Sequence, residues 1–123
     1  MENNKRVLLI WNDPLSAELT KIFLNDLGCD VINPGTENEA WTAAREHQDW
    51  RLVILHSTAA DGFTRDLAED INRRFPAVKI VVVTGDPINK YWFTQRKHFC
   101  EVFSRTAEGL DACLDRIAEL MKD

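Results

Sequence analysis

Two kinds of hydrophobic pattern alternate along this chain. Runs of consecutive apolar residues predict strands that are buried on both faces, because successive strand residues point to opposite sides of a sheet. Stretches in which apolar residues recur every three or four positions predict helices that bury one side. The apolar runs, which we expect to form strands, lie at residues 5–11, 29–32, 51–56, 78–84 and 101–104.

The run at 51–56 is the most informative of the five. Leu52-Val53-Ile54-Leu55, between Arg51 and His56, is typical of a strand in the middle of a parallel sheet. In such sheets, ligands and chemistry gather just past the carboxyl ends of the strands. We therefore expect His56 to lie where a functional site would be.

Helical patterns fill the intervals, at about 14–27, 36–48, 63–75, 87–97 and from 106 onward. Asp13, Thr36 and Thr106 stand where N-cap residues are expected, and Gly28 follows the first helix as a C-cap signal. The first helix carries apolar residues at helical spacing, so we expect its apolar face to pack inward. These residues are Leu15, Leu19, Ile22, Phe23 and Leu27.

Strand and helix thus alternate five times, which indicates an α/β sandwich of three layers. Right-handed crossovers predict a five-stranded parallel sheet with helices on both faces, and the flavodoxin-like strand order 2-1-3-4-5 suits this length. The 123 residues fit one domain, expected over residues 1–123. The last helix ends close to Asp123, so any output domain would lie outside this sequence.

Composition and charge narrow the range of functions. The net charge of −5 argues against general nucleic-acid binding, and the basic cluster Arg96-Lys97-His98 is too small to reverse that. No apolar run approaches the roughly 20 residues that span a bilayer. The N-terminus does not resemble a secretory signal, so we expect a cytoplasmic protein. The three cysteines lack CxxC spacing and predict reduced thiols in the core and no metal site.

Four segments carry a family resemblance: Val7-Leu8-Leu9-Ile10-Trp11-Asn12-Asp13-Pro14, Leu52-Val53-Ile54-Leu55, Asp61-Gly62 and Ile80-Val81-Val82-Val83-Thr84-Gly85. On these segments, and over nearly its whole length, the chain resembles the receiver domain of bacterial two-component response regulators. The resemblance implies the α/β fold expected above and a role in signal transduction or a phosphorelay.

A working receiver uses five groups, according to the resemblance. Two acidic residues after the first strand and a phosphoacceptor aspartate after the third hold Mg²⁺, a hard cation that prefers oxygen ligands. A threonine or serine and a lysine bind the phosphoryl oxygens. The resemblance aligns these positions, in that order, with Trp11 and Asn12, His56, Thr84, and either Ser104 or Arg105.

Only the hydroxyl at Thr84 is retained among these five groups. Trp11 and Asn12 are not carboxylates, and no lysine lies between Phe99 and Ala107. Asp13 matches a third acidic position that some receivers have. The sequence therefore predicts a pseudo-receiver with a degenerate phosphorylation site, holding no metal and no cofactor, with Trp11 filling the space of the ion.

Other interpretations of the site stay open. Asp13, Asp61 or His56 would serve as a non-standard phosphoacceptor. Asp13, Asp61 and Asp86 would form an alternative cation site, although helix capping and a turn explain each singly. His56 would be a metal ligand or a pH switch, or a strand-end residue hydrogen-bonded to Thr84 or Asp13.

Two further classes are disfavoured. A flavin or nucleotide site needs a phosphate-binding loop after the first strand, and Trp11-Asn12-Asp13-Pro14 offers no glycine. No pair of nucleophile and base is recognisable, so we do not expect an enzyme.

The aromatic run Tyr91-Trp92-Phe93 is a candidate partner site. Successive helical residues point about 100° apart, so the three rings cannot all face inward and at least one is expected to be exposed. The resemblance places this run on the surface formed by the helix at 87–97, the strand at 101–104 and the last helix. Receivers use this surface for protein partners or homodimers. The competing interpretation is a ring packed against the fifth strand or its neighbouring helix.

Overall fold

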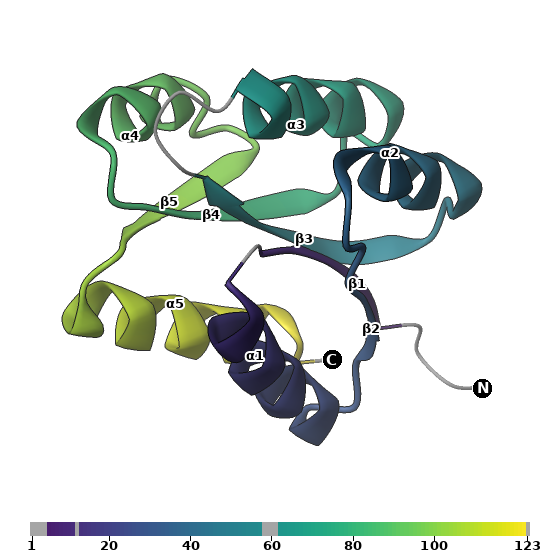
Figure 1. Ribbon diagram of the computed structural model, residues 1–123, viewed down its shortest axis with the longest axis horizontal. Coiled ribbons are helices and arrows are strands. Elements are labelled where there is room, and N and C mark those ends of the chain that lie inside the picture. Colours follow the sequence, from purple (N-terminus) through teal and green to yellow (C-terminus); the bar gives the residue numbers. More distant parts are fainter. Residues whose placement is uncertain (1–4, 12, 58–61, 123) are drawn as a thin grey trace.

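A computed structural model describes residues 5–11, 13–57 and 62–122, which form five strands and five helices in strict alternation (Figure 1). In chain order they are β1 (Arg6–Ile10), α1 (Pro14–Asp26), β2 (Asp30–Ile32), α2 (Glu37–Glu46), β3 (Trp50–Ser57), α3 (Gly62–Arg74), β4 (Lys79–Thr84), α4 (Pro87–Thr94), β5 (Cys100–Ser104) and α5 (Ala107–Leu120).

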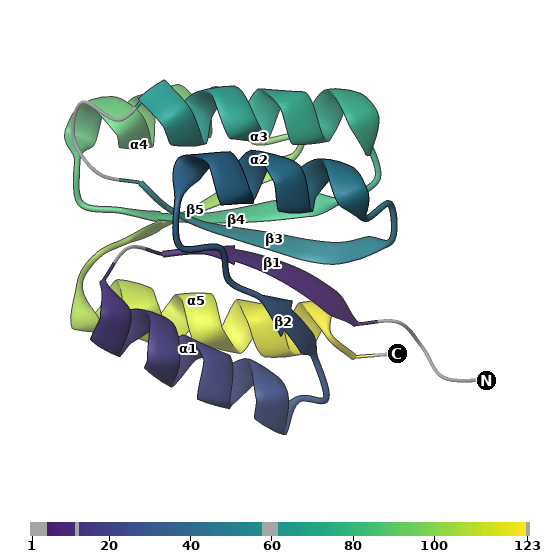
Figure 2. The same cartoon turned by 45° about the vertical axis from the view of Figure 1, so that its right-hand side comes forward.

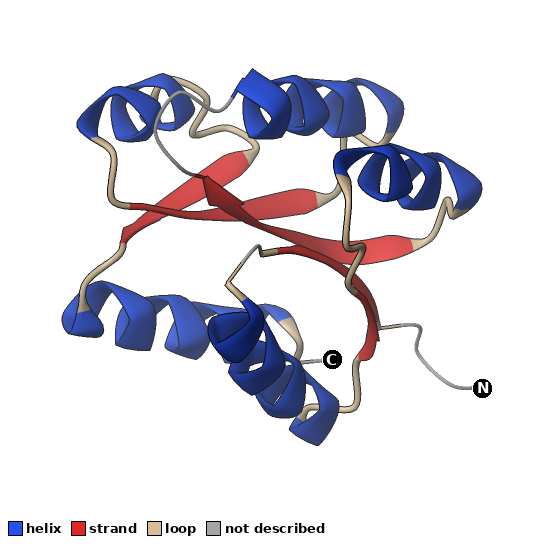
Figure 3. Ribbon diagram, viewed as in Figure 1, coloured by secondary structure: helices blue, strands red, loops and turns tan. Residues whose placement is uncertain are grey.

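The five strands form one parallel sheet in the order β2-β1-β3-β4-β5. Helices α1 and α5 cover one face of this sheet, and α2, α3 and α4 cover the other (Figures 2 and 3). The predicted three-layer, flavodoxin-like architecture is confirmed. Within the described residues, no helix is both long and apolar enough to cross a membrane.

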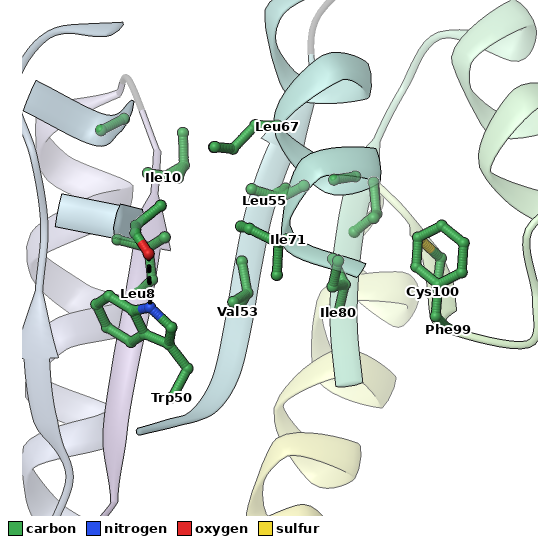
Figure 4. Packing of buried hydrophobic residues seen from close by; sticks show 14 of the residues in the cluster. Leu8, Ile10, Trp50, Val53, Leu55, Leu67, Ile71, Ile80, Phe99 and Cys100 are labelled. Atoms are coloured by element: carbon green, nitrogen blue, oxygen red, sulfur yellow. Dashed lines mark hydrogen bonds between the residues drawn. The ribbon is translucent and has the colours of Figure 1, made fainter. Parts of the chain in front are cut away.

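The middle strand β3 divides the core into two layers. Leu52 and Ile54 pack on the α1 and α5 side, whereas Val53 and Leu55 pack on the opposite side. All four side chains are fully buried, as expected for a strand covered on both faces. Figure 4 shows Val53 and Leu55 close to Ile71 of α3, in the same cluster.

The helix starts follow from their capping residues. Asp13, Thr36, Asp86 and Thr106 each accept a hydrogen bond from the backbone amide three residues ahead, so all three predicted caps and the suggested Asp86 cap are confirmed. Gly28 follows α1 with φ of 82°, a conformation that glycine adopts without steric cost.

The prediction that the apolar residues of α1 pack inward is wrong for three of them. Leu15, Leu19 and Ile22 are 70%, 59% and 50% exposed. The helix lies on the sheet through Ala17 and Leu24, which are buried. At 100° per residue, Leu15 and Ile22 fall on the side of the helix opposite to these two contacts.

Strand and helix ends differ slightly from the predicted ranges. β3 extends to Ser57, and α4 ends at Thr94, short of residue 97. The three cysteines are free and buried, and burial raises the pKa of Cys100 and Cys113 to about 12. The predicted core position of the thiols is confirmed.

Candidate functional site at the carboxyl edge of the sheet

Four of the five strands bring a polar or aromatic residue to one edge of the sheet. Trp11 follows β1, Ser57 ends β3, Thr84 ends β4 and Ser104 ends β5. Ser57 pairs with Thr84, and Thr84 pairs with Ser104, so these residues lie side by side in register. We call this set, together with Asp13, His56, Lys90 and Arg105, the carboxyl edge.

Trp11 and His56 form the centre of the carboxyl edge. Their ring centroids lie 4.7 Å apart and their planes differ by 12°, so the indole stacks on the imidazole. Trp11 is 9% exposed and His56 is 3% exposed. A large aromatic ring therefore covers the residue that the sequence aligned with a phosphoacceptor.

Asp13 is the described carboxylate nearest the start of α1, and it serves as the helix cap. One carboxylate oxygen accepts hydrogen bonds from the Ser16 amide at 3.1 Å and from the Ser16 hydroxyl at 2.5 Å. These two bonds, the hydroxyl first, lower the pKa of Asp13, and the charges of Arg105 and His56 lower it further. The carboxylate of Asp13 is thus already engaged in capping α1.

Thr84 is fully buried and bonded locally. Its hydroxyl oxygen accepts a hydrogen bond from the Asp86 amide at 3.1 Å, and its carbonyl accepts one from the Arg105 amide at 3.2 Å. Asp86 in turn caps α4. The retained hydroxyl therefore helps to shape the turn between β4 and α4.

A lysine does reach the carboxyl edge, but from α4. Lys90 Nζ donates a hydrogen bond to Ser104 Oγ at 3.2 Å. Ser104 is one of the two positions that the family resemblance aligned with the lysine of a working receiver. Nothing in the local pattern around β5 predicts this contact, because it depends on how α4 lies beside β5. A second missed contact joins Thr64 of α3 to Ser57, whose hydroxyls are 3.0 Å apart and buried.

The carboxyl edge thus combines a stacked imidazole, a capping carboxylate, three hydroxyl-bearing strand ends and two cationic side chains. In the described part of the chain, no group of three or more His, Cys, Asp or Glu residues could hold a metal ion. Asn12 and Asp61, which the sequence also singled out, lie outside the described residues.

The three aromatic residues of α4 have different environments. Tyr91 is 69% exposed, whereas Phe93 is fully buried in the core. Trp92 is half-buried, with the Arg96 guanidinium carbon 3.5 Å from its ring centroid and Arg65 on the same ring at 5.7 Å. The expectation that at least one ring is exposed is confirmed by Tyr91, and Ile88, one turn earlier, is equally exposed at 69%.

No family model and no curated protein matches this sequence. Among solved structures, the non-phosphorylated HemR receiver domain of Leptospira biflexa is similar, with 22% identity and a TM-score of 0.78 over 98% of this chain and 96% of that chain. A CheY-like receiver domain protein of Methanospirillum hungatei JF-1 shares 20% identity, with a TM-score of 0.77 over 97% of this chain and 94% of that chain.

A third similar structure is described as belonging to a family of redox sensors in the streptococci that evolved from two-component response regulators. It shares 19% identity with a TM-score of 0.76, and the likeness covers 96% of this chain but only 51% of that one. At these identities the comparisons establish the fold. This chain has the fold of response regulator receiver domains.

Proposed function

We propose that this chain is an atypical receiver domain in two-component signal transduction or a phosphorelay, which acts by protein–protein contact and without phosphorylation. It needs no cofactor, catalyses no reaction of its own and works in the cytoplasm, where its three unpaired thiols would stay reduced. The observation that carries the proposal is the buried stack of Trp11 on His56.

The chemistry of phosphoryl transfer explains why this stack matters. Magnesium in such sites is held by carboxylate oxygens, which offset the charge of the phosphoryl group. Trp11 contributes an apolar ring in place of a carboxylate, and His56 offers no carboxylate to phosphorylate. Asp13 keeps its charge but is bonded to Ser16. The groups that would recruit the ion are therefore absent or engaged among the described residues.

For the contact surface, we propose the side formed by α4, β5 and α5, binding a protein partner or a second copy of this chain. Tyr91 and Ile88 supply two exposed apolar anchors one turn apart on α4. Trp92, between them in sequence, is held by Arg96, because its carbonyl accepts a hydrogen bond from that side chain and its ring packs against the same guanidinium.

Incubation with acetyl phosphate and Mg²⁺, followed by intact mass measurement, tests the absence of phosphorylation. We expect the mass of this chain to stay unchanged. A functional receiver domain, treated in the same way as a positive control, should gain the mass of one phosphoryl group. A stable adduct on this chain would favour the competing hypothesis of a non-standard phosphoacceptor. The variants His56→Gln and Asp13→Asn would then locate that residue.

The partner surface is tested by comparing Tyr91→Ala with the wild type in partner recovery and in oligomeric state by light scattering. We expect reduced association in the variant, because an exposed aromatic anchor is lost without disturbing the core. Trp92→Ala is a poorer choice, since it also removes the packing of Arg96. Equal association of wild type and Tyr91→Ala would remove Tyr91 from the interface.

A further inference from the structure

Basic side chains gather on α2, α3 and the turn after α4, all on one side of the sheet (Figure 2), although the chain as a whole is acidic. We call five of them the cationic patch: Arg45, Arg73, Arg74, Arg96 and Lys97. Two carboxylates, Glu69 and Asp70, form ion pairs with members of the patch. Five cations and two carboxylates carry a net charge of +3, against −5 for the whole chain. This part of the surface therefore favours anions.

Asp70 holds three arginines of the cationic patch in place. Its side chain is only 7% exposed, and it pairs with Arg73 at 2.6 Å and with Arg74 at 3.1 Å on its own helix. Arg45 reaches it from α2 at 4.0 Å. The three arginine side chains are themselves between 46% and 72% exposed. One buried carboxylate thus orients three exposed cations, which reduces the conformational freedom that a ligand would have to remove.

Arg96 is held from another side. Its guanidinium carbon lies 3.5 Å from the ring centroid of Trp92, and the guanidinium donates a hydrogen bond to the Trp92 carbonyl at 3.0 Å. It also donates to Glu69 of α3 at 3.3 Å. Lys97, the next residue, is exposed. The guanidinium of Arg96 is therefore also oriented before any ligand arrives.

An open, polar cavity lies within the cationic patch, between α3 and the turn after α4. We call it the α3–α4 cavity. Its volume is about 620 Å³, within the range of about 300–1,000 Å³ that is typical of small-molecule sites. The residues that line it are Glu69, Asn72, Arg73, Gln95, Arg96, His98 and Phe99. Polar and cationic side chains predominate, so the cavity suits a charged ligand.

The lining of the α3–α4 cavity offers hydrogen-bond donors beyond those that the protein uses. A guanidinium has five N–H donors. In the hydrogen bonds of the described residues, Arg73 donates one, to Asp70, and Arg96 donates two. Further donors in the lining come from the side chains of Asn72, Gln95 and His98. Planar guanidinium groups bind phosphate oxygens through two parallel hydrogen bonds, so the two arginines suit phosphate groups.

We propose that the α3–α4 cavity binds a small molecule that carries a diphosphate or triphosphate group. Linked phosphates would contact Arg73 and Arg96 together, and the volume leaves room for an attached group beside His98 and Phe99. The ion pair between Arg96 and the half-exposed Glu69 is of the weak, solvent-exposed kind, so a phosphate can replace it.

This site is separate from the regions described above. The carboxyl-terminal part of α3 and the turn that precedes β5 place it at the amino edge of the sheet, opposite the carboxyl edge with Trp11 and His56. It is also not the loop after β1, where the sequence disfavours a phosphate site. The proposal therefore does not rest on the proposed receiver function.

Charge favours a compact anion over an extended one. Without the +3 of the cationic patch and its two carboxylates, the rest of the chain has a net charge of −8. A nucleic acid or an acidic protein segment would extend past the patch and meet this negative charge. A small polyphosphate compound fits within the cavity and avoids the repulsion.

Isothermal titration calorimetry of the full chain with inorganic pyrophosphate tests the proposal, and ¹⁵N amide shifts locate the site. We expect saturable binding that weakens with added salt, with shifts at residues 72–74 and 95–98. Orthophosphate should bind at least about tenfold more weakly. ADP carries the same diphosphate. Tighter binding of ADP would support a nucleotide as the ligand, and equal binding would support recognition of the phosphates alone.

Three variants assign binding to the cavity. Arg73→Gln is expected to weaken pyrophosphate binding about tenfold, because a guanidinium in the lining is lost. Arg74→Gln is the matched control, since Arg74 pairs with the same carboxylate but does not line the cavity; its affinity should fall by no more than about twofold. Glu69→Gln should bind several-fold more tightly, because a competing carboxylate is removed.

Several results would overturn the proposal. These are no saturable binding of pyrophosphate or ADP, equal losses in Arg73→Gln and Arg74→Gln, or shifts confined to residues outside the cavity. Tighter binding of a polyglutamate peptide than of pyrophosphate would identify an acidic protein segment as the occupant. Tighter binding of a single-stranded oligonucleotide would identify a nucleic acid.

Discussion

Residue 11 shows how a single side chain determines the chemistry at the carboxyl edge of the sheet. The first strand of the sheet ends at Ile10, so residue 11 lies at the carboxyl edge. Here it is tryptophan, which is 9% exposed and stacks on His56. Burial of an aromatic ring stabilises the folded state, whereas a cluster of unpaired carboxylates in that place would need an ion. On the function proposed above, a buried ring takes the place in which an ion-binding carboxylate would stand.

Trp11→Ala tests this structural role. Removing a buried aromatic ring leaves a cavity, so we expect the free energy of unfolding to fall by about 3 kcal/mol. Urea unfolding measures it, with Trp11→Phe as the control that keeps a stacking ring. Equal stability of wild type and Trp11→Ala would mean that the stack contributes nothing to the fold.

Glu101 provides a pH-dependent test at a single side chain. Its carboxylate receives hydrogen bonds from Arg116 at 2.7 and 3.0 Å, and these bonds lower its pKa below the ordinary value of 4.5. A lowered folded-state pKa stabilises the protein above pH 4.5, and this contribution is lost as the pH falls through the folded-state pKa.

Glu101→Gln should therefore be less stable than the wild type at pH 7, with the difference shrinking as the medium becomes acidic. Thermal unfolding at a series of pH values measures this. Arg116→Leu, which removes the partner of Glu101, is the control and should lower stability at pH 7 in the same way. A stability difference that does not change with pH would contradict the assigned ion pair.

At the scale of elements, the features set by local sequence were predictable and those set by packing were not. The buried strands follow from uninterrupted apolar runs such as Leu52 to Leu55, and the helix starts follow from capping residues such as Thr106. The direction of the apolar face of α1 depends on which side meets the sheet, and Ala17 made that contact in place of Leu19.

The same distinction applies to the candidate site. Trp11, His56, Thr84 and Ser104, all candidates from the sequence, lie at one edge of the sheet, because parallel strands end at the same edge. The contact of Lys90 with Ser104 could not be predicted, since it joins two elements whose relative position depends on side-chain packing. Stacking of Trp11 on His56 is likewise a tertiary feature, although both residues were candidates from the sequence.

Gly109 offers a test of how α5 is joined to the end of β5. A Cβ atom at this position would collide with the Ser104 carbonyl oxygen and would lie 2.8 Å from its carbonyl carbon. Glycine to alanine in a helix normally stabilises by up to about 1 kcal/mol. Here the collision reverses the sign, and we expect Gly109→Ala to destabilise by about 1–3 kcal/mol.

The matched control is Gly85→Ala, where the new Cβ would meet the Arg105 Cβ at 3.6 Å, an ordinary contact. Denaturant unfolding of both variants measures the difference. A Gly109→Ala protein as stable as Gly85→Ala would show that α5 does not approach Ser104 this closely.

The whole molecule separates its candidate functions in space. The sheet divides a face covered by α1 and α5, two helices with a combined net charge of −4, from a face covered by α2, α3 and α4 (Figure 2). The exposed Leu15, Leu19 and Ile22 belong to α1 on the first face, whereas Tyr91 and Ile88 belong to α4 on the second face. The carboxyl edge lies between these two faces, so the proposed contact residues Tyr91 and Ile88 are separate from the Trp11–His56 stack.

The most direct test of a phosphorylation-independent receiver domain is a titration of the ¹⁵N-labelled protein with Mg²⁺ and beryllofluoride, a mimic of an acyl phosphate. If Trp11 and His56 have replaced the ion site, the amides of Thr84, Ser104 and their neighbours should not shift at concentrations that saturate a functional receiver. Saturable shifts at these residues would contradict the account.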